Sequence, residues 1–457
     1  MDRDRAEQPQ QQEQRKRRRV RPSLPIRWLG QAIALVAVTP ARAVRGTARR
    51  VADPARQVAA YWQSDRATIR QGFGAVTVSS IGSLVSGIVL AGMEARLDAI
   101  VGLFVLIPAA IGMRGNIFGA LSARFGTSIH AGLFEVSRRR DSPFFQNVYA
   151  VTLLTVATSV VMGILARAIA ALLGIATISA WDYIAISLVG GTLSSAVVLV
   201  MTLGLSVLSY RRGWDLDSVG GPIITMMGDL VTLPALLLAS YLVDVGFVTP
   251  AVGALGVGLA ALSIVRGWTT SLEVTRKIVR ESFPVLCLAI VLDVLAGSVV
   301  EPRVEGVFLP YPAFLLILPS FLEDIGALGS IMAARLGSKL HLGAVSPTAR
   351  PDATALLDGT VVLSIGVVQY SFLSLATLVL SELLGKAHPG VPTFIGVIMV
   401  GAMIATLVAS IIGYYAGVVS YRFGFDPDNH TIPMVTSGMD LLGVICLVIA
   451  LSLFGVA

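Results

Sequence analysis

The stretch that decides the fold is Gly213–Asp229, GWDLDSVGGPIITMMGD, which returns later in the chain as Gly424–Asp440, GFDPDNHTIPMVTSGMD. In both stretches a polar, acidic loop leads to a proline, and an aspartate follows seven residues after the proline within an apolar run. An ionisable side chain within a membrane span costs roughly 2.5–3.5 kcal/mol on insertion scales, so such a residue marks a functional site by default. Two of them in equivalent places predict one shared site.

The composition is that of a protein with many membrane spans. The 457 residues are 55% apolar and 14% charged, whereas soluble domains carry about 25% charged residues. Long apolar runs indicate helices, and the sequence lacks the short alternating strands of a transmembrane barrel. The two cysteines, Cys287 and Cys446, lie far apart in apolar runs, which excludes a disulfide framework. We therefore expect an all-α polytopic membrane protein.

Eleven apolar runs follow residue 72, each close to the ~20 residues that a helix needs to cross the hydrocarbon core. We expect membrane-spanning helices near residues 73–93, 99–121, 148–174, 183–209, 219–242, 247–267, 284–301, 310–332, 359–385, 392–419 and 431–455.

The charges of the loops predict the orientation of these helices. Basic residues gather in alternate loops, for example at Arg138–Arg140, Arg211–Arg212 and Arg276–Arg280, whereas the other loops hold few, such as Arg96 and Lys386. The positive-inside rule then predicts a cytoplasmic N-terminus and an extracytoplasmic C-terminus. We expect a multi-pass protein of the plasma membrane.

A basic tail, residues 1–71, precedes the first span. Of the 35 lysines and arginines, 16 lie in the first 73 positions. We expect residues 1–21 to be disordered and residues 29–39 to form an amphipathic surface segment. The basic charge favours contact with anionic lipids of the cytoplasmic leaflet over binding of nucleic acid.

The chain repeats itself at a constant offset of 211 residues. Pairs at this offset are Glu94 and Glu305, Pro108 and Pro319, Gly115 and Gly326, Arg124 and Arg335, Tyr210 and Tyr421, Asp215 and Asp426, Asp217 and Asp428, Pro222 and Pro433, Thr225 and Thr436, and Asp229 and Asp440. Each half has five spans, so direct fusion would invert the second half, and the sixth span restores its orientation. This arrangement predicts parallel halves related by a pseudo-two-fold axis along the membrane normal.

The repeat sets the expected domain boundaries. We expect five-helix repeats at residues 72–242 and 284–457, joined by a linking helix and a cytoplasmic connector at residues 243–283. Because one chain supplies both halves as a pseudo-dimer, an obligate homodimer is not required.

The fifth span of each half carries the candidate metal ligands. Thr225 and Asp229 share a helix face with Pro222, and Thr436 and Asp440 repeat this pattern. Each aspartate lies ~10 Å beyond its proline, well below the surface. If both faces line the axis, two carboxylates and two hydroxyls form an oxygen-only site, the kind that hard divalent cations such as Mg²⁺ prefer. Alternatively, each aspartate pairs with an arginine of its own half.

Four further carboxylates precede these spans at the cytoplasmic mouth: Asp215, Asp217, Asp426 and Asp428. Asp217 and Asp428 can cap the orphan N–H groups of the helix or attract cations, and we weigh these roles equally. The other two aspartates favour a cation entrance or exit.

The second span of each half ends in a glycine-rich signature. In the first copy, at residues 108–132, small residues permit close helix approach or local unwinding, and Asn116 can present an oxygen to a lumen. The second copy has Ala327 in place of the asparagine and adds Glu323 and Asp324. The predicted site is therefore only pseudo-symmetric.

These signatures resemble the membrane domain of MgtE-type magnesium channels and, more closely, the solute carrier family 41 proteins. The residues that carry the resemblance are Pro108, Gly115, Asn116 and Arg124, and the pattern of Asp215, Asp217, Pro222 and Asp229 with its copy Asp426, Asp428, Pro433 and Asp440. In MgtE-type proteins five spans dimerise around a pore whose deep aspartate selects Mg²⁺. The resemblance implies that Asp229 and Asp440 take that position, with the fused chain acting as its own dimer.

We therefore predict divalent cation transport, of Mg²⁺ above all, through an acidic site on the axis between the repeats. The alternative is a Na⁺- or H⁺-coupled carrier, either a Mg²⁺ exchanger or a small-solute transporter. A third reading, an intramembrane aspartyl protease, rests on the pair Gly228-Asp229. The second copy breaks that pair, so we expect no enzyme, and no cofactor other than Mg²⁺ as the transported ion.

Overall fold

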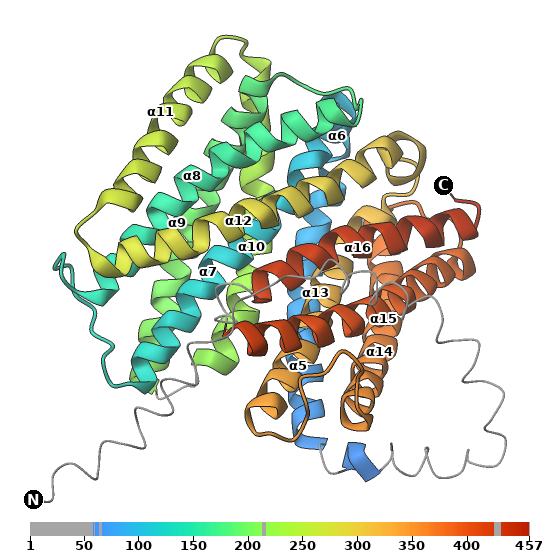
Figure 1. The fold of residues 1–457 in the computed structure, drawn as a ribbon. Coiled ribbons are helices and arrows are strands. Elements are labelled where there is room, and N and C mark those ends of the chain that lie inside the picture. Colours follow the sequence, from blue (N-terminus) through green and yellow to red (C-terminus); the bar gives the residue numbers. More distant parts are fainter. Residues whose placement is uncertain (1–57, 59, 64–65, 213–215, 425–430, 457) are drawn as a thin grey trace, which may run out of the picture. The chain divides into compact units, whose positions relative to one another are not determined.

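The computed structural model of the protein describes residues 58, 60–63, 66–212, 216–424 and 431–456, and every element in these ranges is a helix (Figure 1). Eleven of the described helices are long and apolar enough to cross a membrane, which is the number predicted. The chain is therefore a multi-pass membrane protein. Most of the predicted tail, residues 1–71, lies outside the described ranges.

The long helices are α5 (Arg66–Gly92), α7 (Ile107–His130), α8 (Pro143–Leu172), α9 (Ala180–Arg212), α10 (Leu216–Ser240), α11 (Val248–Thr269), α12 (Glu273–Val300), α13 (Ala313–His341), α14 (Ala353–Leu384), α15 (Val391–Phe423) and α16 (Ile432–Leu453). Short helical pieces connect some of them: α6 (Glu94–Ala99), η1 (Leu103–Leu106), η2 (Tyr241–Asp244), η3 (Glu301–Arg303) and η4 (Val304–Phe308).

Several helices extend beyond the apolar runs that predicted them. The helix α12 begins at Glu273 instead of near residue 284, and α7 and α13 continue to His130 and His341. Charged turns beyond the hydrocarbon core still form backbone hydrogen bonds, so apolar runs underestimate helix length. The helix α7 is continuous through its glycines, and the expectation of local unwinding there is wrong.

Local capping sets some of the helix ends. Ser142 precedes α8 and accepts a hydrogen bond from the backbone N–H of Phe145 at 3.1 Å. Asp352 does the same for Ala355 before α14, at 2.9 Å. The helix α14 ends at Gly385, whose φ of 63° is the left-handed conformation that glycine adopts without strain.

The first helix of each predicted repeat packs against the other repeat. The helix α5 lies along α13, and α12 lies along α7 and α8, while each also contacts the fifth helix of its own set (Figure 1). These crossings are close, because a Cβ on Gly87 of α5 would lie 1.8 Å from the carbonyl oxygen of Leu316, and one on Gly297 of α12 would lie 2.6 Å from that of Val105. The two predicted repeats are therefore interlocked by α5 and α12.

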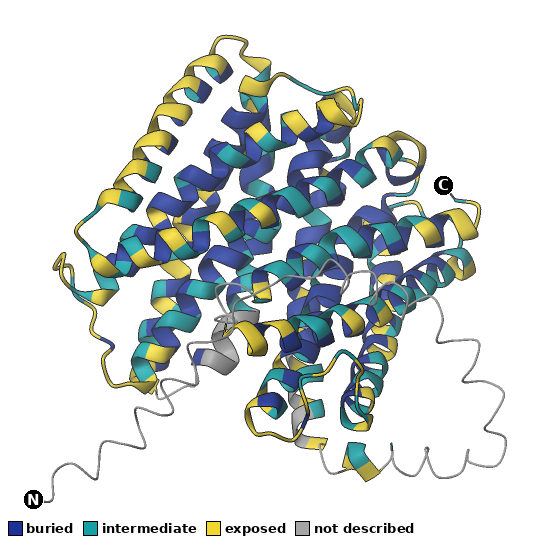
Figure 2. Cartoon of the chain, in the orientation of Figure 1, coloured by how far each residue is buried: buried dark blue, intermediate teal, exposed yellow. Residues whose placement is uncertain are grey.

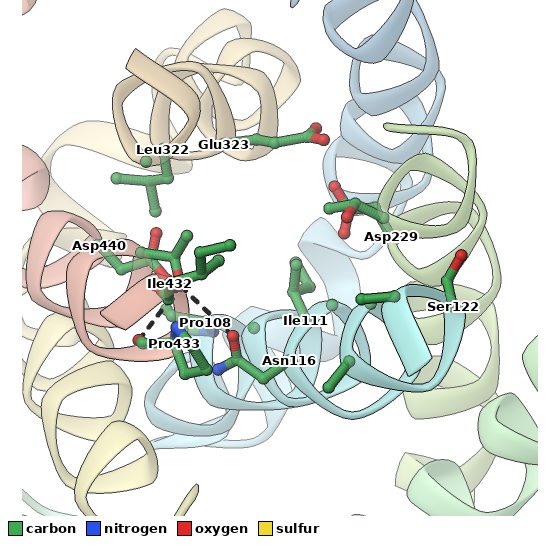
Figure 3. A pocket seen from close by; sticks show the side chains of 18 of the residues that line it. Pro108, Ile111, Asn116, Ser122, Asp229, Leu322, Glu323, Ile432, Pro433 and Asp440 are labelled. Carbon is green, nitrogen blue, oxygen red and sulfur yellow. Dashed lines mark hydrogen bonds between the residues drawn. The ribbon is translucent and has the colours of Figure 1, made fainter. Parts of the chain in front are cut away.

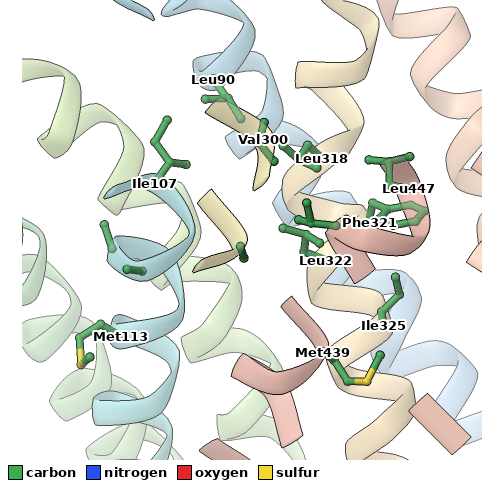
Figure 4. Packing of buried hydrophobic residues seen from close by; sticks show 14 of the residues in the cluster. Leu90, Ile107, Met113, Val300, Leu318, Phe321, Leu322, Ile325, Met439 and Leu447 are labelled. Atoms are coloured by element: carbon green, nitrogen blue, oxygen red, sulfur yellow. The ribbon is translucent and has the colours of Figure 1, made fainter. Parts of the chain in front are cut away.

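Buried apolar side chains fill the space where these helices meet. Figure 4 shows part of this core, with Leu90 from α5, Val300 from α12 and Phe321 from α13. The helix α11, in contrast, packs mainly against α8 and α9 and also contacts α12, and its outer face is exposed (Figure 2). That face carries Leu255 and Leu262, which suits contact with lipid tails.

Candidate cation site

A cavity of ≈ 520 Å³ lies between α7, α10, α13 and α16. All five residues predicted to hold a metal ion line it: Asp229 and Thr225 from α10, Asp440 and Thr436 from α16, and Asn116 from α7. Figure 3 shows the two aspartates on opposite sides of the space, with Asn116 between them along one edge. The structure thus brings the five residues together, although their binding of a metal ion stays a prediction.

The walls of the cavity repeat at the offset seen in the sequence. Lining residues that lie 211 positions apart are Pro108 and Pro319, Ile111 and Leu322, Gly115 and Gly326, Thr225 and Thr436, and Asp229 and Asp440. One lining pair departs from this likeness, because Gly112 of α7 corresponds to Glu323 of α13. Glu323 therefore adds a carboxylate to one side of the cavity.

Asp229 is buried with incomplete hydrogen bonding. Its side chain is 1% exposed, and its Oδ2 accepts a hydrogen bond of 2.9 Å from Ser83 Oγ of α5. Among the described residues its Oδ1 has no hydrogen-bond partner. Because buried polar atoms are nearly always hydrogen-bonded, this oxygen is available to a water, a proton or a cation in the cavity.

Glu323 shares the same donor. Ser83 Oγ also lies in hydrogen-bond contact with Glu323, to which Ser79 donates as well. The carboxyl groups of Glu323 and Asp229 are themselves neighbours (Figure 3). Because a hydroxyl carries a single hydrogen, Ser83 cannot serve both carboxylates at once. This side of the cavity is short of hydrogen-bond donors and of positive charge.

On the other side, Asp440 lies against Asp293 of α12. Their carboxyl groups are in contact, and Ser437 lies beside Asp293. Asp293 is 0% exposed, and neither of its oxygens accepts a well-formed hydrogen bond. A Cβ on Gly112 would lie 2.8 Å from Asp293 Oδ2, so a side chain at this position would require the carboxyl group of Asp293 to shift.

Asn116 connects two of the helices around the cavity. Its Oδ1 accepts a hydrogen bond from Thr436 Oγ1 at 3.3 Å, and its Nδ2 donates to Ser437 Oγ at 3.4 Å. The amide therefore holds α7 of one repeat to α16 of the other.

A match to a protein family identifies the kind of protein. The MgtE model, described as a divalent cation transporter, matches the chain at residues 107–239 and again at residues 318–450. The chain belongs to the MgtE family. Each match begins at the second helix of a predicted repeat and ends in the fifth, so the MgtE matches leave out α5 and α12.

Individual relatives of this MgtE-family chain are members of solute carrier family 41. Solute carrier family 41 member 2 of Xenopus laevis is 26% identical over 377 residues, which cover 76% of this chain and 64% of the relative. The human member 2 is 25% identical over 378 residues, covering 76% and 63%, and the Mus musculus member 3 is 22% identical over 366 residues, covering 75% and 73%. The chain thus spans less than two thirds of the member 2 relatives. No solved structure matches the chain.

The arginines of the MgtE signature do not pair with the aspartates of the cavity. Arg335 forms an ion pair of 2.7 Å with Asp358, and Arg124 donates to Asn147 Oδ1 at 2.8 Å. Within the described part of the chain, Asp229 forms no ion pair, and the same holds for Asp440. The hypothesis that each aspartate is neutralised by an arginine of its own half is therefore wrong.

The structure does not describe the side chains of the four carboxylates predicted at the cytoplasmic mouth. Asp215, Asp426 and Asp428 lie outside the described residues, and Asp217 falls in the first turn of α10 with its side chain outside them. Leu216, at the start of α10, does line the cavity. The cavity thus reaches the end of the helix where these carboxylates were expected.

Sequence reasoning missed three polar residues of the site. The sequence pattern gives Glu323 no role, and it marks neither Asp293 nor Ser83. Their counterparts at the offset of 211 are Gly112, Gly82 and Val294, so a search for repeated residues discards them. A carboxylate within an apolar span was the available signal for the first two.

Proposed function

We propose that this chain carries divalent cations, and Mg²⁺ in particular, across the plasma membrane through the cavity between α7, α10, α13 and α16. The observation that carries the proposal is the free, buried Oδ1 of Asp229, which lines a cavity that Asp440 lines from the other side. A buried carboxylate is stable only when a cation or a bound proton neutralises its charge, and a cation in the cavity would do so. Membership of a divalent cation transporter family supports the same conclusion.

The donor set favours Mg²⁺ over softer metals. The lining residues offer carboxylate, hydroxyl and amide oxygens, with no cysteine or histidine among those described. Within the described residues, no three acidic, histidine or cysteine side chains are close enough to hold one ion directly. Direct tetrahedral binding is typical of Zn²⁺, whereas Mg²⁺ keeps several waters and is held by one or two carboxylates.

The cavity is large enough for a hydrated ion. Six waters occupy roughly 180 Å³ at about 30 Å³ each, and the cavity measures ≈ 520 Å³. A divalent ion that moves inward down ~100 mV gains ~4.6 kcal/mol, so uptake needs no further energy source. With the N-terminus in the cytoplasm, as the loop charges predict, the starts of α10 and α16 face the cytoplasm. Because one chain supplies both sides of the cavity, a monomer suffices.

A coupled carrier is the second candidate function, and the number of carboxylates favours it. Asp229, Glu323, Asp440 and Asp293 lie at or against the cavity, and one Mg²⁺ neutralises only two of them. A Na⁺ or H⁺ that balances the remainder would make the protein an exchanger.

Flux into proteoliposomes tests both candidates. We expect Mg²⁺ uptake by the wild type, and loss of uptake to background in Asp229→Asn/Asp440→Asn. Asp98→Asn is the matched control, since Asp98 is exposed and does not line the cavity. Undiminished flux in the double variant would overturn the site. An imposed Na⁺ or H⁺ gradient separates the candidates, because a simple channel carries Mg²⁺ without either gradient.

A further inference from the structure

The carboxylates of the cavity fall into two groups. Asp229 and Glu323 lie together on one side, and Asp440 lies on the other side (Figure 3), in contact with Asp293. Each group combines residues of two different helices, α10 with α13 and α16 with α12. A single ion midway between Asp229 and Asp440 would leave Asp293 without a partner.

Asp293 has no structural partner that explains its place. It is 0% exposed, its neighbours are Ser437 and Asp440, and neither of its oxygens accepts a well-formed hydrogen bond. No lysine, arginine or histidine among the described residues forms an ion pair with it. Two carboxylates in contact away from water repel each other, so either a cation or a proton must lie between them.

The pair is open to the cavity at one place. Asp440 itself lines the cavity, and so does Gly112 of α7, which faces both carboxylates. A Cβ there would come within 2.8 Å of Asp293 Oδ2 and 3.5 Å of Asp440 Oδ2. The missing side chain thus leaves the two carboxylates within reach of an ion from the cavity.

We propose that Asp293 and Asp440, with the hydroxyl of Ser437, form a second cation subsite, separate from the one at Asp229 and Glu323. The subsite takes a small hard cation, Mg²⁺ or Na⁺, because its ligands are all oxygens. The proposal rests on the proposed transport function and extends it: the cavity holds two cations at once. The MgtE matches do not cover Asp293, since α12 lies between residues 239 and 318.

The subsite has no copy in the first half of the chain. The counterpart of Asp293 is Gly82 of α5, and the side chain of Met226 packs against it. The two subsites therefore differ in their ligands, and a single substitution can remove one and spare the other.

Cation titrations of the purified full chain test the proposal. Calorimetry with Mg²⁺ alone, Na⁺ alone, and Mg²⁺ in the presence of Na⁺ gives the number of sites and the ion that each prefers. We expect two cation sites in the wild type and a loss of at least about tenfold in affinity at one of them in Asp293→Asn. Glu323→Gln should weaken the other site instead. If Asp293→Asn alters the titration with Mg²⁺ alone, the second subsite binds Mg²⁺. If it alters the titration with Na⁺ alone, the subsite binds Na⁺.

Two controls keep the outcome decisive. Asp293→Asn removes a repulsive charge and should fold, and thermal unfolding verifies this. The second control is Ser437→Ala, which keeps both carboxylates and should weaken the same site. If Asp293→Asn and Ser437→Ala both bind cations as the wild type does, the pair shares a proton and the second subsite does not exist. If the wild type itself binds and transports no divalent cation, the proposed function fails instead. The two failures are therefore distinguishable.

Discussion

Ser83 of α5 donates a hydrogen bond of 2.9 Å to Asp229 of α10, and the same hydroxyl lies in contact with Glu323 of α13. This one side chain contacts a carboxylate of each predicted repeat at the candidate cation site. It lies on a helix that the family match does not cover, so α5 contacts the candidate site as well as packing against other helices.

Replacing Ser83 by alanine should weaken the site without removing a ligand. In Ser83→Ala the carboxylate of Asp229 loses its donor and its fixed orientation, and loss of such a supporting contact typically lowers metal affinity 10–100-fold. We expect a rise of roughly tenfold in the Mg²⁺ concentration for half-maximal flux. Ser371→Ala is the control, since Ser371 donates to the carbonyl of Val367 in its own helix. Equal Mg²⁺ dependence in both variants would contradict a role for Ser83.

Gly112 offers a steric test. In Gly112→Ala the new methyl group would lie 2.8 Å from Asp293 Oδ2, so the carboxyl pair must shift. We expect Mg²⁺ flux to fall at least about tenfold, since a loss of that order follows when groups supporting a metal site are displaced. The control is Gly337→Ala in α13, where a Cβ meets nothing within 4 Å. A flux ratio near one between the two variants would show that Gly112 does not protect the site.

The ion pair of Arg335 with Asp358 allows a stability test in which side chains found in the first repeat replace their counterparts in the second. Asp358 also pairs with Lys339 at 2.5 Å, so Asp358→Asn removes the carboxylate that both cations contact and should lower the unfolding free energy by about 1–3 kcal/mol. The first repeat has Asn147 and Ser128 at the equivalent positions.

The double variant Asp358→Asn/Lys339→Ser copies that arrangement. We expect it to recover much of the lost stability, measured as the midpoint of thermal unfolding in detergent. A double variant no more stable than Asp358→Asn would show that the two repeats do not balance charge in the same way.

Arg114 should be dispensable for stability. It is 0% exposed, and among the described residues only its Nε has a partner, Ser194 Oγ at 3.0 Å, while its two terminal nitrogens have none. The second repeat has Ile325 at this position. Since an unpaired buried charge is unfavourable, Arg114→Met should raise the unfolding free energy by roughly 1–4 kcal/mol. Thermal unfolding checks this, and a clear loss of stability would indicate a charge partner for Arg114.

The sequence alone predicted the number of long helices, whereas it predicted only some of the residues at the cavity. Eleven apolar runs predicted eleven long helices, because hydrophobic length is set by the bilayer. The lining by Asp229 and Asp440 followed from their repetition on one helix face.

Asp293 and Ser83 could not be found in the same way. Both belong to first helices, which pack against the fifth helix of their own set and the second helix of the other set. Hydropathy and spacing within a helix carry no record of which distant helix lies beside it. Glu323 and Gly112 show a second limit of the sequence analysis. A search for repeated residues keeps only residues that the two halves share, whereas this cavity is lined partly by residues that differ between the halves.

The packing of α5 against α13 has a consequence for biosynthesis. The main partner of α5 is α13, which begins 221 residues after α5 ends, so α5 must remain in the membrane without that partner while the intervening helices are made. At about 5–20 residues per second, this interval lasts roughly 10–45 s. During it, the serines and glycines of α5 have no neighbouring helix from the second half. A chain interrupted in the connector before α12 would therefore expose this polar face to lipid, and cellular quality control could recognise it.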